Sequence, residues 1–206
     1  MWPRLVTAVT AAAEQPNPQS LLASYGALVT LEPTPDEVPV LLLTGTIGVG
    51  KTVVADEISL KLEVAGRRVS NIDVDALCQI FPRPADDPFG ERLRLAALRM
   101  LWAIHREAGA ELLVLVAVVE SDATVGGYRE ALPGAAITVV RLAASDEAIR
   151  MRLHHREQGS DLEWNLERTA ELQRSFEAGP LQAIVIETSD CSVSEVAELV
   201  LRAVGW

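Results

Sequence analysis

The segment Gly45–Thr52 has the residue types and the spacing of a phosphate-binding loop. It reads Gly-Thr-Ile-Gly-Val-Gly-Lys-Thr and fits the Walker A pattern G-x-x-x-x-G-K-[ST]. Glycines let the backbone curl tightly, so that successive N–H groups converge on one anion. Lys51 would add positive charge for the β- and γ-phosphates of a nucleotide, and the Thr52 hydroxyl would be a ligand of Mg²⁺. We therefore expect nucleotide phosphates at Gly45, Thr46, Ile47, Gly48, Val49, Gly50, Lys51, Thr52 and Val53, with Thr52 also as a metal ligand.

Three acidic side chains follow apolar segments that are typical of strands. Asp73 and Asp75 are two residues apart, so they would share one face if the strand expected at Arg68–Val74 continued through both. A carboxylate there could accept the proton of a substrate hydroxyl or hold water on Mg²⁺. We predict Asp75 as the base and Asp73 as its orienting or metal-linked partner; the alternative is that Asp75 only caps the segment that follows. Glu120 comes after the strand expected at Glu111–Val119, as a metal-linked acid would, or it is simply a solvated strand end.

Two arginines lie one helical turn apart in a polar segment late in the chain. Arg152 and Arg156 would be neighbours on one helix face. Arginine is suited to stacking on a base and to bidentate phosphate contact. A glycine-containing break at residues 158–161 would let residues 150–165 act as a closing lid. The alternative is a solvated helix whose arginines pair with nearby glutamates.

The composition excludes several classes of partner. The formal net charge is -11 and the isoelectric point is about 4.7, whereas nucleic acid and anionic membranes require a cationic surface. No window approaches the ~18 uninterrupted apolar residues of a membrane span. Cys78 and Cys191 are far apart, without a C-x-x-C pattern, and are expected to be small buried thiols. We expect a soluble cytoplasmic protein that binds neither nucleic acid nor membrane.

From residue 37 onwards the pattern alternates strands and helices. Strands are expected at Val38–Leu43, Arg68–Val74, Glu111–Val119, Ile137–Leu142 and Ala183–Glu187. Helices are expected at Lys51–Ala65, Glu91–Ala108, Ser145 to about Arg156, Leu162–Ala178 and Ser192–Val204, with a short helix within residues 121–132 and an irregular segment at 75–90. This alternation predicts an α/β domain, residues 37–206, whose parallel sheet is covered on both faces. Ligands then bind beyond the carboxyl ends of the strands.

Residues 1–36 are predicted to form a helical N-terminal extension. Apolar residues recur at helical spacing in two short stretches, separated by Pro16 and Pro18. Such amphipathic helices would pack on the core domain or on a second subunit, so a homodimer is possible.

The order of these motifs resembles the P-loop nucleoside and nucleotide kinase group. Its members closest in pattern are small-molecule kinases: adenylylsulfate, shikimate and gluconate kinases and the chloramphenicol phosphotransferase-like enzymes. The resemblance covers about residues 38–206. It implies the P-loop NTPase fold, a three-layer α/β/α arrangement with a five-stranded parallel sheet in the order 2-3-1-4-5. It also implies ATP with Mg²⁺ as the phosphate donor.

The same resemblance implies roles for particular residues. Asp73 or Asp75 would meet the acceptor hydroxyl, Arg152 would stack on adenine, and Arg156 would reach the transferred phosphate. The loop with Thr188, Ser189 and Asp190 would line the adenine. The expected function is ATP- and Mg²⁺-dependent transfer of phosphate to a hydroxyl of a small-molecule acceptor.

Two other functions stay open at this point. Adenylate-type kinases of this group have a D-G-[FY]-P-R segment after the third strand, and this chain has none, so the resemblance makes a nucleoside monophosphate a less expected acceptor. The acceptor would bind near residues 75–90, a segment in which Arg83 is the only basic residue. A regulator that binds nucleotide with little or no transfer, or an ATPase whose acceptor is water, would share the same loop.

Overall fold

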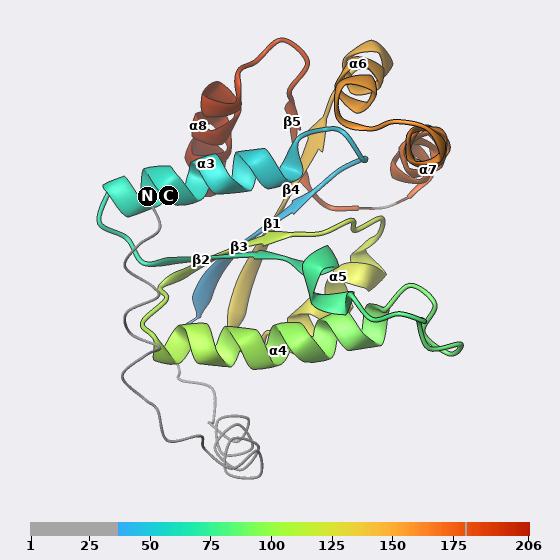
Figure 1. Ribbon diagram of the computed structural model, residues 1–206. Coiled ribbons are helices and arrows are strands. Elements are labelled where there is room, and N and C mark those ends of the chain that lie inside the picture. The colour runs from blue at the N-terminus through green and yellow to red at the C-terminus, as the bar shows by residue number, and fades with distance from the viewer. Residues whose placement is uncertain (1–36, 180) are drawn as a thin grey trace, which may run out of the picture. The chain divides into compact units, whose positions relative to one another are not determined.

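The computed structural model describes residues 37–179 and 181–206, and these contain a five-stranded parallel sheet (Figure 1). The strands are β1 (Val38–Thr44), β2 (Val69–Asp73), β3 (Leu112–Val116), β4 (Ala135–Ala143) and β5 (Ile184–Glu187). They are ordered β2-β3-β1-β4-β5, which confirms the predicted order. The predicted N-terminal helices, residues 1–36, lie outside the described residues.

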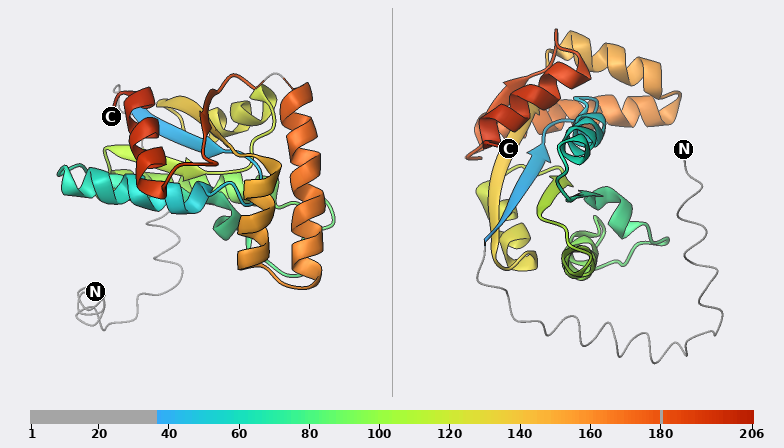
Figure 2. Two further views of the ribbon diagram at one scale, coloured as in Figure 1. Left: turned by 90° about the horizontal axis from the view of Figure 1, so that it is seen from above. Right: turned by 90° about the vertical axis from the view of Figure 1, so that its left-hand side faces the viewer.

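Helices cover both faces of the sheet, which confirms the three-layer arrangement (Figure 2). α3 (Lys51–Val64) and α8 (Val193–Val204) pack on one face, and α4 (Glu91–Glu107) and α5 (Asp122–Ala131) pack on the other. The side chains of β1 alternate between the two cores, because neighbouring residues of a strand point to opposite faces. Leu41 and Leu43 join the α3–α8 core, whereas Val40 and Leu42 join the α4–α5 core.

The remaining two helices lie beyond the carboxyl ends of the strands. α6 (Asp146–Arg156) and α7 (Ser160–Ala178) stand side by side at the end of the sheet where β1 runs into α3 (Figure 1). The polar break between them is shorter than predicted, because α7 begins at Ser160 rather than at Leu162. None of the helices within the described part of the chain is long and apolar enough to cross a membrane.

The end of β2 differs from the prediction. The strand stops at Asp73, and a 3₁₀ helix, η1 (Val74–Cys78), begins at once. The Asp73 carboxylate causes the change of direction, because its Oδ1 accepts a hydrogen bond from the amide of Asp75 at 3.0 Å. Asp73 is therefore the capping residue, and the expectation that Asp73 and Asp75 share one face of a continuing strand is wrong.

Candidate functional site

The loop between β1 and α3 has a backbone that only glycine can adopt. Gly45, Gly48 and Gly50 have φ angles of +140°, +82° and +101°. A Cβ on Gly45 would overlap the carbonyl oxygen of Leu142, and a Cβ on Gly48 would lie 2.9 Å from Cγ of Leu153. The loop is therefore a tight cradle held against β4 and α6, as the Walker A pattern requires.

The amino end of α3 faces this cradle without a side-chain cap. Gly50 is the N-cap residue, and no side chain in the described part of the chain hydrogen-bonds to the amides of the first turn. The first N–H groups of a helix have no intrahelical acceptor, and the helix dipole makes this end positive. The loop and the helix end together fit a phosphate group.

Lys51 is half-buried beside the carbonyl oxygens of the same loop. Its Nζ donates to Gly45 O at 3.1 Å and to Thr46 O at 2.9 Å. Burial lowers the pKa of Lys51 to about 8, although the carboxylates of Asp75 and Asp73 act in the opposite direction.

Three of the predicted catalytic residues influence the pKa of Lys51. Besides Asp75 and Asp73, the guanidinium of Arg156 also influences the ammonium and lowers its pKa further. These three groups come from β2, η1 and α6, so charged side chains of three elements act on the ammonium group of the phosphate loop. Charges of both signs therefore influence Lys51.

Thr52 and Asp73 form a candidate metal site. The Thr52 hydroxyl donates to Asp73 Oδ2 at 3.1 Å, so an alcohol oxygen and a carboxylate oxygen lie side by side at the start of α3. The described residues contain no cluster of three or more acidic, histidine or cysteine side chains that could hold a metal ion. This set fits Mg²⁺, which uses few protein ligands together with phosphate oxygens and water.

Arg152 connects α6, the loop after β5 and the phosphate loop. Its Nη2 donates to Thr188 O at 2.7 Å, while Nη1 donates to Thr188 Oγ1 at 3.1 Å and to Val49 O at 3.3 Å. Ser189 is fixed next to this contact, because its hydroxyl donates to Glu187 Oε1 at 2.6 Å. The structure therefore places the predicted adenine loop against the phosphate loop, with Arg152 as the link.

Arg156 and Asp190 are both exposed to solvent. Arg156 forms an ion pair with its neighbour Glu157 at 2.7 Å, and its side chain is 57 % exposed. Asp190 is exposed on the loop that leads into α8. Their predicted contacts with the transferred phosphate and with adenine stay predictions.

We expect the substitution Arg152→Lys to weaken ATP binding by about tenfold, because lysine cannot reproduce the planar fork of guanidinium donors. Isothermal titration with a non-hydrolysable ATP analogue and Mg²⁺ measures the change in the dissociation constant. Arg150→Lys is the matched control, since Arg150 is exposed on the same helix. Equal affinities for all three proteins would show that Arg152 has no part in nucleotide binding.

Glu120 is paired with an arginine that sequence reasoning missed. Arg168 of α7 donates from Nη2 to Glu120 Oε1 at 2.7 Å and from Nη1 to Glu171 Oε2 at 3.0 Å. Next to it, the Thr169 hydroxyl donates to the carbonyl oxygen of Ile47 in the phosphate loop at 3.3 Å. Glu120 is thus more than a solvated strand end. Its predicted contact with Mg²⁺ stays a prediction.

A second arginine that sequence reasoning missed lies on the acceptor side. Arg94 is in the first turn of α4, and its Nη1 is 3.5 Å from Asp75 Oδ1. Within residues 75–90, Arg83 is turned onto its own segment and donates from Nη1 to Pro88 O at 3.2 Å. The helix pattern around Arg94 is that of an ordinary amphipathic surface, so only its position directly after the acceptor region could have singled it out.

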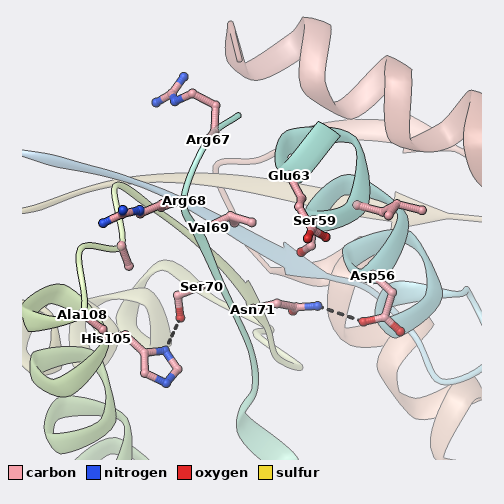
Figure 3. Close-up of a pocket in the computed structure, with 12 residues that line it drawn as sticks. Asp56, Ser59, Glu63, Arg67, Arg68, Val69, Ser70, Asn71, His105 and Ala108 are labelled. Carbon is pink, nitrogen blue, oxygen red and sulfur yellow. Dashed lines mark hydrogen bonds between the residues drawn. The ribbon is translucent and has the colours of Figure 1, made fainter. Parts of the chain in front are cut away.

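A cavity of about 650 Å³ lies away from this site, along the edge strand β2 (Figure 3). Its walls come from α3 and α4 and are tied to the strand by two hydrogen bonds. Ser70 Oγ is 2.6 Å from His105 Nδ1, and Asn71 Nδ2 donates to Asp56 Oδ1 at 2.9 Å. None of the predicted site residues lines this cavity in the described chain.

Several solved structures share this architecture. A gluconokinase from Sinorhizobium meliloti 1021 matches with a TM-score of 0.51 at 22% identity, over 84% of this chain and 94% of that chain. A tunicamycin resistance protein from Deinococcus radiodurans matches with a TM-score of 0.55 at 20% identity, over 82% and 96%. A shikimate kinase from Aquifex aeolicus matches with a TM-score of 0.50 at 16% identity, over 81% and 96%.

These similarities define the fold. The chain has the α/β fold of the P-loop small-molecule kinases, as the resemblance of its motifs implied. No protein-family model matches the chain, and no curated protein matches its sequence.

Proposed function

We propose that this protein is an ATP- and Mg²⁺-dependent phosphotransferase that acts on a hydroxyl group of a small molecule. The observation that carries this proposal is that Asp73 accepts a hydrogen bond from Thr52 of the phosphate loop, while the charges of Asp73, Asp75 and Arg156 all act on the ammonium group of Lys51. A loop that only bound a nucleotide with Mg²⁺ would need the glycines, the lysine and one carboxylate, but not a second carboxylate whose charge acts on that lysine. The kinase names of the structural neighbours are consistent with the proposal.

The donor half of the site consists of the phosphate loop and α3. The loop amides and Lys51 would hold the β- and γ-phosphates, with adenine near Arg152, Thr188, Ser189 and Asp190. Thr52 and Asp73 would hold Mg²⁺, which neutralises charge on the phosphate oxygens when it is bound. Because ATP is the donor, we place the protein in the cytoplasm.

In the transfer step, Asp75 would accept the proton of the acceptor hydroxyl. As the hydroxyl oxygen forms its bond to the γ-phosphorus, the bond from that phosphorus to the β–γ bridging oxygen breaks, and ADP leaves with the electron pair. Lys51 would stabilise the charge on the transferring group. Arg156 would also stabilise this charge by exchanging its partner Glu157 for the phosphate, since the Arg156 side chain is exposed and its charge already acts on Lys51. Catalysis would come mainly from positioning and charge neutralisation.

Labelled ATP and a panel of alcohols test this function directly. The full-length protein is incubated with ATP carrying a radioactive γ-phosphate and Mg²⁺, with and without each alcohol, and ADP and labelled products are quantified. A phosphotransferase gives a labelled alcohol and acceptor-dependent ADP release. ADP release that is independent of every alcohol would indicate an ATPase. ATP binding without ADP release would indicate a nucleotide-binding regulator.

A further inference from the structure

A single guanidinium group fastens both ends of residues 75–90, which we call the acceptor segment. Arg94 donates from Nη2 to Phe89 O at 2.6 Å and from Nε to Gly90 O at 3.4 Å, at the end of the segment. At its start, Nη1 of the same side chain forms the ion pair with Asp75 Oδ1. The position of Asp75 is therefore coupled to the course of the whole segment through one side chain.

Arg94 is enclosed, whereas the carboxylate it holds is open. The Arg94 side chain is 16% exposed and that of Asp75 is 62% exposed. Behind Arg94 lies the buried Tyr128 of α5. Burial raises the pKa of Tyr128 to about 12, against the opposing influence of the Arg94 guanidinium. Arg94 thus lies between the neutral phenol of Tyr128 and the solvent-facing carboxylate of Asp75. From this position its side chain can hold Asp75 in place.

The other two arginines near the acceptor segment also form hydrogen bonds to groups of that segment. Residues 75–94 contain three arginines and no other basic side chain. Arg83 donates to Pro88 O, and Arg92 donates from Nη2 to Asp86 Oδ2 at 2.6 Å. A carboxylate on the acceptor would therefore find no arginine of residues 75–94 that is not already bound within this region. It would also be repelled by the negative charge of Asp75.

The acceptor segment also exposes large apolar side chains. Ile80, Phe81 and Phe89 are 47%, 74% and 69% exposed, and they lie within ten residues of each other in the sequence. Several large apolar side chains exposed on one short segment favour a ligand-binding surface. These side chains are suited to the non-polar part of a molecule whose hydroxyl reaches Asp75.

We propose that Arg94 is a positioning residue that fixes Asp75 and the acceptor segment, and that this segment takes an uncharged alcohol with an apolar body rather than a hydroxy acid. This inference rests on the proposed phosphotransfer function, because it describes the acceptor half of that same site.

Four probes test the class of the acceptor. 1-Phenyl-1,2-ethanediol and mandelate share a phenyl ring and a hydroxyl group but differ in charge, and glucitol and gluconate form a second such pair without a ring. Binding to the full-length protein with Mg²⁺ and a non-hydrolysable ATP analogue is measured by ligand-observed NMR, and transfer is measured with ATP. We expect the phenyl diol to bind about tenfold more tightly than mandelate, and the substitution Phe81→Ser to reduce this preference.

Two outcomes would overturn the acceptor class. One is binding of mandelate or gluconate as tight as that of the matching uncharged alcohol, and the other is the absence of saturable binding by both 1-phenyl-1,2-ethanediol and glucitol. Failure of the proposed function is a separate result: it is the absence of Lys51-dependent transfer from ATP to any alcohol or acid. Transfer to gluconate alone would thus retain the function and reject this inference.

Arg94→Lys tests the positioning role, because it keeps the positive charge and loses the guanidinium fork. We expect the KM for the best acceptor of the panel to rise by about tenfold or more, with the dissociation constant for ATP unchanged. Hydrogen exchange at the amides of residues 79–90 should become faster. Arg99→Lys, on the exposed side of the same helix, is the control. If acceptor KM and hydrogen exchange both stay at the wild-type values in Arg94→Lys and in Arg94→Gln, Arg94 does not position the segment.

Discussion

Replacing Lys51 with methionine is expected to reduce phosphotransfer by roughly a thousandfold or more and, at the same time, to stabilise the folded protein at neutral pH. The loss of activity follows from the chemistry of the step, because cations that neutralise the transferring phosphoryl group contribute about 10³-fold or more to its rate. Methionine keeps an unbranched side chain of similar length, so the loop should keep its shape.

The gain in stability follows from the lowered pKa of Lys51. Burial reduces it from 10.5 to about 8, so the unfolded chain binds more protons than the folded one between these two values. The ammonium group is therefore destabilised by folding at pH 7, and removing it should raise the free energy of unfolding by about 1–3 kcal/mol. Loss of the hydrogen bonds to Gly45 O and Thr46 O offsets part of this gain. The wild-type protein should approach the variant in stability as the pH rises from 8 towards 10.5.

Denaturant unfolding at pH 7 and near pH 10, together with ADP release, measures both effects. Lys61→Met is the matched control on the same helix. Lys61 is paired with Glu198 and Glu57, and its pKa is raised, chiefly by the hydrogen bond to Glu198, so its removal should not stabilise the protein at pH 7. Full activity in a folded Lys51→Met protein would sink the proposed function. A variant less stable than wild type at pH 7 would contradict the electrostatic account of Lys51.

Asparagine substitutions at Asp73 and Asp75 should distinguish the residue that binds the metal from the residue that accepts the proton. We expect Asp73→Asn to raise the Mg²⁺ concentration needed for half-maximal activity, because the oxygen next to the Thr52 hydroxyl loses its charge. Asp75→Asn should lower transfer by roughly 10²–10⁴-fold, because it removes the base and weakens the ion pair with Arg94 on the acceptor side. It should leave the affinity for ATP and Mg²⁺ unchanged, because Asp75 is not one of the predicted metal ligands. Asparagine retains an oxygen at each position, so the turn at the end of β2 can persist.

Transfer rates measured across a Mg²⁺ titration distinguish the two variants. Asp56→Asn, on α3 and hydrogen-bonded to Asn71 outside the site, is the control for removing one negative charge. Rapid transfer by Asp75→Asn, with strong loss in Asp73→Asn, would assign the base to Asp73 instead. Unchanged Mg²⁺ dependence in Asp73→Asn would exclude that residue from the metal site.

The sequence was sufficient for the fold and for the phosphate loop because both depend on local patterns. Apolar strands alternating with long helices predict a covered parallel sheet, and the loop is defined by eight consecutive residues. The end of β2 was not predictable in this way. Asp73 could either continue the strand or bond to the amide of Asp75, and the choice between them depends on packing as well as on the residue type.

The two missed arginines illustrate contacts that join distant parts of the chain. Glu120 and Arg168 are 48 residues apart and come together only because α7 lies across the carboxyl ends of the strands. Arg94 reaches Asp75 because the acceptor segment folds back on itself. In the sequence, both arginines lie in amphipathic helices with acidic neighbours, which is the pattern of an ordinary solvated surface. Their roles depend on helix placement and loop course, which residue spacing does not encode.

Contacts from α6 and α7 with three consecutive residues of the phosphate loop have a thermodynamic consequence. Thr169 bonds to the carbonyl of Ile47, Leu153 packs where a side chain of residue 48 would lie, and Arg152 bonds to the carbonyl of Val49. The loop is thus held in its curled form by the fold itself, so its conformational entropy is lost during folding rather than on association with nucleotide. Preorganisation of this kind favours tight and fast capture of phosphate. Since Arg152 and Leu153 also contact the loop, we expect movement of the lid predicted at residues 150–165 to be confined to residues 154–165, which include Arg156.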